Sequence, residues 1–329
     1  MKVSIFARPA WGPRSVPIKL YSFDEVLSYR PEQREVYIEG MLYEGQTAVL
    51  HGPSGHGKSY FTAFLAALMS AGGDVDDILY APKPRKVAYL QAEATVFDFR
   101  ERVEPPVRVY GWGQKVRENF AFGQVSGVDL TRRKETAALE SAVGDYDVVF
   151  LDTLSAFAEA SANDDDAMGK VEDWASEVHM RHPKVALVFI HHDHRNRRDS
   201  TGKLIDEGDD TFSGSHKVKA MADQMWQYRI SGGVAKFHQT KSRSRLHRIP
   251  DFTARLDDES GLLTFEREAN GPAVLLAAVR RKGRLSPSDL KEWTFEKKVS
   301  ERTVARYIKE LRDLGSLHKE GEDIVLTTG

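Results

Sequence analysis

Short, almost fully apolar runs alternate with longer amphipathic stretches through the first two-thirds of the chain. The apolar runs lie at residues 47–51, 86–91, 147–151 and 185–190. The amphipathic stretches lie at residues 58–71, 96–103, 131–143 and 165–181. Strands that are apolar on both faces and separated by helices form parallel sheets covered on both sides. The pattern therefore predicts an α/β fold with a mainly parallel sheet flanked by helices.

Two later segments alternate in the manner of antiparallel hairpins. Residues 223–241 contain a Ser-Gly-Gly turn between two strand-like runs, and residues 252–268 have their turn at residues 257–261. Glycines at such turns supply the positive φ angles that tight hairpins need. We expect both hairpins to extend the sheet along one edge.

The C-terminal region has a different pattern. After a polar junction at residues 268–272, three short amphipathic stretches are followed by a hairpin that turns at residues 320–322. Three helices and a terminal hairpin are typical of a winged helix-turn-helix domain. The chain is therefore expected to have an N-terminal arm with a short helix, a large α/β domain and a small winged-helix domain, at residues 1–36, 37–268 and 269–329.

Composition sets limits on the function. The 329 residues include 47 lysines and arginines against 49 aspartates and glutamates, so nucleic-acid contacts must come from local basic clusters. The chain has no cysteine, which excludes disulfides, thiolate chemistry and cysteine-ligated zinc. Pro9, Pro13 and Pro17 interrupt its start, and no segment reaches the roughly 18 apolar residues of a membrane helix. We expect a soluble cytoplasmic protein without membrane contact.

A glycine-rich loop joins the first apolar run to the first amphipathic stretch. It fits the pattern G-x-x-x-x-G-K-S and comprises Gly52, Pro53, Ser54, Gly55, His56, Gly57, Lys58 and Ser59, followed by Tyr60. In such a loop, backbone N–H groups surround phosphates at a helix N-terminus. Lys58 would reach the β- and γ-phosphates and the Ser59 hydroxyl would bind Mg²⁺, whereas a chance glycine-rich turn would do neither. The strand–loop–helix context favours ATP and Mg²⁺ as cofactors.

Two carboxylates follow other predicted strands. Asp152 comes directly after the run at residues 147–151, where a second Mg²⁺ contact is needed, although a strand-terminal aspartate also serves as a helix cap. Glu93 follows the run at residues 86–91 and is either a general base for an attacking water or a surface acid. We expect Asp152 to bind the metal.

The fourth apolar run ends in histidines. A polar side chain at this strand end can sense the γ-phosphate and pass its state to the segment that follows. His191, His192, Asp193 and His194 also suggest a metal site. Adjacent residues of a strand point to opposite faces, which makes them a poor chelate. We therefore favour phosphate sensing over metal binding.

These strand ends, in this order, resemble the RecA-like ATPase core and, more narrowly, the RepA-like hexameric helicases and the wider AAA_25 group. The resemblance rests on the glycine-rich loop and on segments 87–95, 148–157 and 187–195, and it covers residues 37–268. It implies that Glu93 is the catalytic base and that His192 senses the γ-phosphate, with His191 beside it. It also implies a homo-oligomer, as a hexameric ring or a filament, with ATP bound between subunits.

A ring of this kind needs cations from the neighbouring subunit to stabilise the charge of the transition state. Lys241 and Arg243 form a K-x-R pair after a predicted strand, similar to the trans-acting pair of DnaB-type helicases. A solvated basic hairpin end is the alternative. Lys217, Lys219 and Arg229 compete for the same trans-acting role.

Two basic sets are candidates for nucleic-acid contact. The first comprises Arg195, Arg197, Arg198 and Lys203, and the second comprises Arg302, Arg306 and Lys309. The second set is spaced i, i+4, i+7 and shares one face of the third predicted helix of the winged-helix domain, where phosphates can bind. Acidic neighbours make a solvated loop and a protein-docking domain the respective alternatives.

Together these features predict a DNA-dependent ATPase. The first expectation is a RepA- or DnaB-like ring helicase or translocase on single-stranded DNA, serving replication of a phage or other mobile element. The second is a RecA-type recombination ATPase that forms filaments on DNA. The third is an ATP-switched regulator that binds DNA through its winged helix. That domain is also a candidate docking site for a replication or recombination partner.

Overall fold

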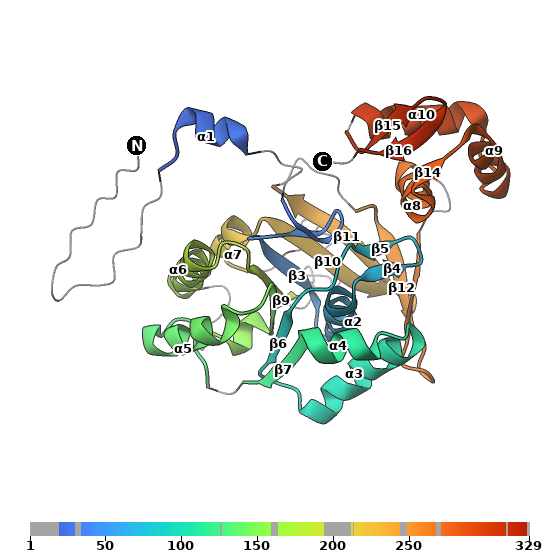
Figure 1. Ribbon diagram of the computed structural model, residues 1–329. Helices are drawn as coiled ribbons and strands as arrows, with labels where there is room; N and C mark the ends of the chain where they lie inside the picture. Colours follow the sequence, from blue (N-terminus) through green and yellow to red (C-terminus); the bar gives the residue numbers. More distant parts are fainter. Residues whose placement is uncertain are drawn as a thin grey trace, which may run out of the picture.

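The computed structural model describes residues 20–29, 34–125, 127–158, 164–193, 212, 214–243, 249–267, 271–313 and 315–327. These residues form a large α/β body, preceded by the short helix α1 (Phe23–Ser28), and a smaller C-terminal unit (Figure 1). None of the described helices combines the length and the apolar character that crossing a membrane requires.

A nine-stranded sheet forms the centre of the large body (Figure 1). In spatial order its strands are β13 (Leu263–Glu266), β12 (Phe252–Leu256), β11 (Val234–Ser242), β10 (Gln224–Ser231), β3 (Thr47–Pro53), β9 (Ala186–Asp193), β8 (Val148–Asp152), β6 (Val87–Gln91) and β7 (Phe120–Gln124). The strands from β10 to β7 are parallel, and β11, β12 and β13 continue the sheet in antiparallel pairs. The α/β prediction is confirmed, and the hairpins extend one edge of the sheet.

Both faces of the sheet are apolar. Alternate residues of a strand point to opposite sides, and in these strands the residues on both sides are apolar. In β3, Ala48 and Leu50 pack on the side of α2, whereas Val49 packs on the opposite side. The first layer contains α2 (Lys58–Ala71), α3 (Val96–Val109) and α4 (Gly113–Asn119). The second contains α5 (Arg133–Val143), α6 (Asp165–Arg181) and α7 (His216–Met221).

The helix α3 runs past the predicted end at residue 103, through Pro105 and Pro106. Proline inside a helix costs a hydrogen bond. Packing offsets that cost, because Pro106 is buried and Pro105 lies against Gly261. The short elements α4 and β7 were not predicted, since neither shows a strong period of apolar residues. Their place comes from tertiary contacts, such as the ring of Phe122 stacked 4.4 Å from that of Phe99.

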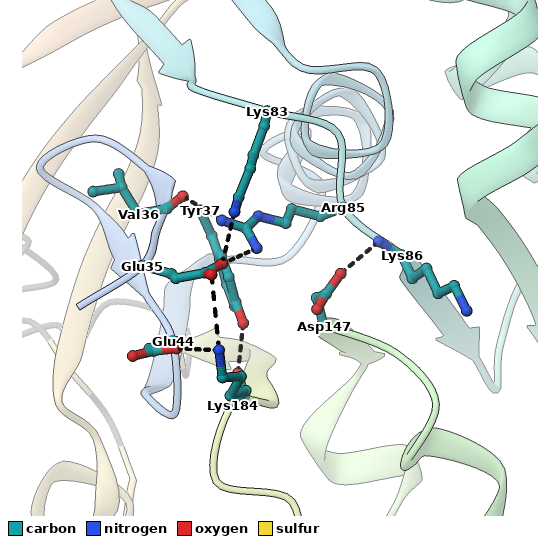
Figure 2. A network of polar contacts seen from close by, with 9 residues as sticks. All are labelled: Glu35, Val36, Tyr37, Glu44, Lys83, Arg85, Lys86, Asp147 and Lys184. Carbon is teal, nitrogen blue, oxygen red and sulfur yellow. Dashed lines mark hydrogen bonds and ion pairs between the residues drawn. The ribbon is translucent and has the colours of Figure 1, made fainter. Parts of the chain in front are cut away.

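The strands begin at the amino edge of the sheet, where a network of charged side chains gathers (Figure 2). Arg85 donates a hydrogen bond to Glu35 and lies 4.5 Å from the ring centre of Tyr37. The ammonium groups of Lys83 and Lys184 lie 3.2 and 3.7 Å from carboxylate oxygens of Glu35. These contacts hold the start of β1 (Val36–Ile38), which pairs with β2 (Leu42–Tyr43), against the sheet.

The C-terminal unit has an apolar core of its own, which includes Leu275, Trp293 and Leu311. Its elements are α8 (Pro272–Lys282), β14 (Arg284–Leu285), α9 (Pro287–Glu296), α10 (Glu301–Asp313), β15 (Leu317–Glu320) and β16 (Asp323–Leu326). Ion pairs between α8 and the large body join Arg280 to Glu39 and Arg281 to Asp77. Asp77 lies in the hairpin of β4 (Gly73–Val75) and β5 (Leu79–Ala81). The winged-helix assignment and the domain boundaries stay predictions.

Candidate nucleotide site

The glycine-rich loop follows β3 at the carboxyl edge of the sheet, the edge where the parallel strands end. Gly52 pairs with His192 of β9, and a Cβ atom at Gly52 would lie 2.1 Å from the carbonyl oxygen of Tyr228. Gly55 and Gly57 have φ angles of 78° and 74°, in the left-handed region that favours glycine. The sequence therefore folds here into a loop that turns sharply into the N-terminus of α2, which suits an anion.

Lys58, the first residue of α2, is almost fully buried within this loop. Its ammonium donates hydrogen bonds to the carbonyl oxygens of Gly52 at 2.7 Å and Pro53 at 2.8 Å, and to Nδ1 of His192 at 2.9 Å. Burial lowers the pKa of Lys58 to about 8, against the opposing effect of nearby carboxylates. Burial and the neighbouring ammonium also lower the pKa of His192. The two predicted phosphate-contacting residues are thus in direct contact.

Asp152 ends β8 and is fully buried. Its Oδ2 atom accepts a hydrogen bond from the Tyr89 hydroxyl at 2.8 Å, and Ser59 also donates to the carboxylate. Its Oδ1 atom is buried without a hydrogen-bond partner among the described residues. Burial raises the pKa of Asp152. A buried carboxylate oxygen beside the Ser59 hydroxyl fits the oxygen ligands that Mg²⁺ prefers, so these two residues would hold the ion.

Glu93 follows β6, the strand beside β8, and is exposed. Its Oε1 atom accepts a hydrogen bond from the Thr153 hydroxyl at 3.0 Å. The charges of Asp152 and Glu93 both raise the pKa of Lys58, against the larger effect of burial, so all three residues lie at one edge. The exposure of Glu93 leaves its carboxylate open to a water molecule, as a general base requires.

The histidines of β9 alternate across the strand. His192 faces Lys58, while His191 is buried and lies 5.2 Å, ring centre to ring centre, from Phe212. His194 lies outside the described residues. Within the part of the chain that the structure describes, no group of three histidine, aspartate or glutamate residues is arranged to hold a metal ion.

Arg102 belongs to this edge although sequence reasoning missed it. Its guanidinium lies 5.6 Å from the ring centre of Tyr60, and its charge partly opposes the rise that burial causes in the pKa of Asp152. Its Nη1 atom is buried without a hydrogen-bond partner in the described ranges. The signal was present, since Arg102 lies three residues after the buried Phe99 and four before the buried Pro106. A charged residue on the buried face of a helix indicates a polar environment inside the fold.

The cations predicted to act in trans occupy two different places. Arg229 lies near the glycine-rich loop of its own chain, where its charge lowers the pKa of His56 after the larger effects of burial and of Lys58. Lys241 and Arg243 lie at the opposite end of the hairpin, because Ser242 pairs with Gln224 at the start of β10. Both are therefore at the amino edge of the sheet.

Carbonyl groups at the end of α7 receive these two cations. Lys241 donates to the carbonyl oxygen of Lys219, and Arg243 donates to that of Ala220. Arg243 also lies 3.3 Å from a carboxylate oxygen of Asp223. Basic side chains stabilise a helix C-terminus in this way. Lys217, another candidate, lies on α7 with its ammonium 3.4 Å from a carboxylate oxygen of Glu172.

Of the two basic sets, only the second lies within the described residues. Arg195, Arg197, Arg198 and Lys203 lie outside the described residues. Arg302, Arg306 and Lys309 are exposed along α10 and form no ion pair within the described part of the chain. Other cations of the C-terminal unit do pair with acids. Lys282 lies 2.9 Å from Asp289, and Arg284 lies 3.4 Å from Asp323.

Comparisons with solved structures include matches of low sequence identity. Among solved structures, the RadB recombinase is 16% identical with a TM-score of 0.47, over 67% of this chain and 90% of that one. A KaiC-like protein from the hyperthermophilic archaeon Pyrococcus horikoshii is 13% identical with a TM-score of 0.47, over 70% of this chain and 94% of that one. A search of curated proteins gives no match.

The family comparison covers the glycine-rich loop and the ends of β6, β8 and β9. The model of the AAA_25 family, described as an AAA domain, matches residues 13–198, more than half of the 329 residues. The chain has an α/β fold in which a large, mainly parallel sheet is flanked by helices and a loop of G-x-x-x-x-G-K-S type follows β3. The chain belongs to the AAA_25 family of AAA domains.

Proposed function

We propose that this ATPase hydrolyses ATP in response to DNA and works as a ring helicase or translocase on single-stranded DNA. The observation that carries the proposal is the contact between Lys58 and His192, whose Nζ and Nδ1 atoms lie 2.9 Å apart. A γ-phosphate bound by Lys58 meets His192 directly. The chain after His192 leads into the first basic set, so the state of the phosphate has a short path to a DNA-binding segment.

In this proposal each residue of the carboxyl edge has one task. Lys58 binds the phosphates, Ser59 and Asp152 hold Mg²⁺, and Glu93 orients and deprotonates water. The metal supplies charge stabilisation at the phosphates when it is bound. Lys241 and Arg243 lie at the amino edge of the sheet, too far along the strands to serve their own glycine-rich loop, so an action on a neighbouring subunit in a ring is the role we propose for them.

One observation favours a second function, that of an ATP-switched DNA-binding regulator. The exposed cations Arg302, Arg306 and Lys309 of α10, which form no ion pair with any residue the structure describes, contrast with the paired cations of α8 and β14 in the same unit. Unpaired lysines and arginines along one helix face are suited to phosphate contact. In a helicase the same surface would hold the enzyme at its site of action, or dock a replication or recombination partner.

Measuring ATP turnover with and without single-stranded DNA, on protein whose mass is determined in the same buffer, tests the proposal. A ring translocase gives turnover that rises with DNA in a species of discrete, ring-sized mass. A species whose size grows with the length of the DNA would identify a filament. Turnover that is indifferent to single strands would overturn the helicase and favour the regulator.

A further inference from the structure

A buried histidine–aspartate pair lies at the ends of β3 and β9, on the face of the sheet turned away from α2. The Nδ1 atom of His51 lies 3.2 and 3.1 Å from the two carboxylate oxygens of Asp193, and the side chains are only 1% and 2% exposed. Because a carboxylate only accepts hydrogen bonds, Nδ1 of His51 carries the proton that joins them. The Nε2 atom of His51 is buried without a hydrogen-bond partner among the described residues.

The pair fixes the two strands that form the nucleotide site. His51 directly precedes the glycine-rich loop on β3, and Asp193 directly follows His192 on β9. Adjacent residues of a strand point to opposite faces. The His51–Asp193 contact therefore holds the strand end from behind, while Nδ1 of His192 lies 2.9 Å from Nζ of Lys58 in front.

The chain returns to the same place after the first basic set. The ring centre of Phe212 lies 5.2 Å from that of His51 and 5.2 Å from that of His191. Gly214 has no room for a side chain, because a Cβ atom there would lie 2.9 Å from the Phe212 ring and 3.1 Å from Nε2 of His191. The residues just before and just after segment 194–211 thus pack on one cluster.

We propose that His51 and Asp193 are positioning residues that hold His192 against Lys58 and so set how well the site distinguishes a nucleoside triphosphate from a diphosphate. The inference rests on the proposed function, in which His192 senses the γ-phosphate. A buried polar pair of this kind is a weak source of stability, because desolvation offsets much of its attraction. Its location one residue from His192 and one residue from Gly52 gives it a task in the geometry of the site.

Asp193→Asn tests the proposal most gently, because it keeps the shape of the side chain and removes its charge. We expect the Kd for a non-hydrolysable ATP analogue to rise about tenfold, the loss of one charge-assisted contact, while the Kd for ADP changes less than about twofold. A general loosening of the fold would weaken both nucleotides together. An unchanged ratio of the two dissociation constants would overturn the proposal.

A double-mutant cycle with His192→Ala shows whether the pair acts through His192. In the His192→Ala background we expect Asp193→Asn to leave the ratio of ATP to ADP affinity where it is. An equal loss in both backgrounds would assign the effect of Asp193 to another group, such as Lys58, and would overturn the positioning role.

A second pair of variants separates an effect on the site from a loss of folding. His51→Phe leaves a buried carboxylate without its partner and is expected to destabilise the protein. The double variant His51→Phe with Asp193→Leu removes that cost, because both side chains are apolar. It should fold and show the reduced discrimination of Asp193→Asn, and full discrimination in this variant would contradict the proposal.

A matched control lies on β11, where Nδ1 of His238 is 2.8 Å from a carboxylate oxygen of Asp251 on the surface. His238 lies opposite Gln227, which in turn pairs with His51, so only strand β10 separates the two histidines. His238→Gln removes an exposed histidine–aspartate pair that does not touch His192 or its strand, and should leave the ratio unchanged. Failure of the wild-type protein to bind ATP would refute the proposed function. A wild-type ratio in Asp193→Asn would refute only the role of the pair.

Discussion

The two edges of the central sheet differ in the partners of their carboxylates. At the amino edge, acids and bases pair with one another, as in Glu35 with Lys83, Arg85 and Lys184 (Figure 2). At the carboxyl edge, hydroxyl groups donate to the carboxylates of Asp152 and Glu93, and no cation forms an ion pair with either within the described residues.

The difference appears in the acid–base behaviour of the two edges. Hydrogen bonding from Arg85 is the main cause that lowers the pKa of Glu35, whereas burial raises the pKa of Asp152. Burial likewise lowers the pKa of Lys58, whose hydrogen-bond partners are two carbonyl oxygens and an imidazole and include no carboxylate. At the carboxyl edge, Asp152 and Glu93 have no cationic partner among the described residues, which suits a metal ion and a phosphate, and the His51–Asp193 pair lies on the face turned away from α2. The paired charges of the amino edge suit stability instead.

The largest expected effect concerns Arg243, because a catalytic cation at the amino edge would contradict a purely stabilising role for that edge. Arg243 is held by Ala220 and Asp223 of its own chain, yet we propose that it acts on a neighbouring subunit. Arg243→Ala should then lower the turnover of assembled protein about 10³-fold, the effect of a lost trans-acting arginine. The measurement is ATP turnover of subunits carrying Arg243→Ala mixed with subunits carrying Lys58→Ala.

Such mixing restores activity only where an intact glycine-rich loop faces an intact Arg243. Lys241→Gln, which removes the neighbouring contact to Lys219, is measured beside it. Mixtures with no more activity than the separate variants would show that Arg243 only stabilises the end of α7.

Glu93→Gln tests the carboxyl edge itself. The amide cannot take a proton from water but can still accept from Thr153, so turnover should fall by at least about 10²-fold while ATP binding persists. Binding is followed by calorimetry and turnover by phosphate release. Turnover within a few-fold of the wild type would exclude Glu93 as the base and leave it a surface acid.

The C-terminal unit offers the same contrast between paired and unpaired charges on a smaller scale. Replacing Arg302, Arg306 and Lys309 together by alanine should weaken duplex DNA binding about tenfold or more and reduce its salt dependence, because phosphate contacts release counterions. Arg284→Ala, at a cation paired with Asp323, is the control and should change binding little. Equal effects of both changes would contradict phosphate contact by the α10 cations and leave protein docking as the role of this helix.

At the amino edge the expected effect is on stability and is smaller. Glu35→Gln should lower the free energy of unfolding by about 1 kcal/mol at neutral pH, since a hydrogen bond to a charged partner is weakened. The pKa of Glu35 is lowered in the folded state, so its contribution is present above the unfolded pKa and is lost as the pH falls through the folded one. Denaturant unfolding between pH 3 and pH 7 should show a gap between wild type and variant that closes toward the acidic end. A gap that stays constant would contradict the ion-pair account.

Local sequence patterns were sufficient for the elements that form the candidate nucleotide site. The apolar runs predicted β3, β6, β8 and β9, and the glycine-rich loop predicted the start of α2 at Lys58. Strand ends in a parallel sheet meet at one edge, so β8 and β9 bring Asp152 and His192 to the same edge as the glycine-rich loop.

Contacts between residues distant in sequence were out of reach. Arg102 reaches the site from the middle of α3, and the partners of Glu35 lie about 50 and about 150 residues further along the chain. Lys241 and Arg243 cap α7 because a hairpin folds back beside it, which no local pattern encodes. Contacts made by long side chains between distant elements are therefore the main feature that the sequence did not predict.

The most direct test of the carboxyl edge as an ATP-hydrolysing site is steady-state ATP turnover by wild-type protein and by Lys58→Ala, with and without Mg²⁺. The account predicts Mg²⁺-dependent turnover in the wild type and its loss in Lys58→Ala, whose thermal unfolding should remain that of a folded protein. Near-normal turnover in Lys58→Ala, or wild-type turnover that persists when Mg²⁺ is chelated, would contradict the assignment of this edge.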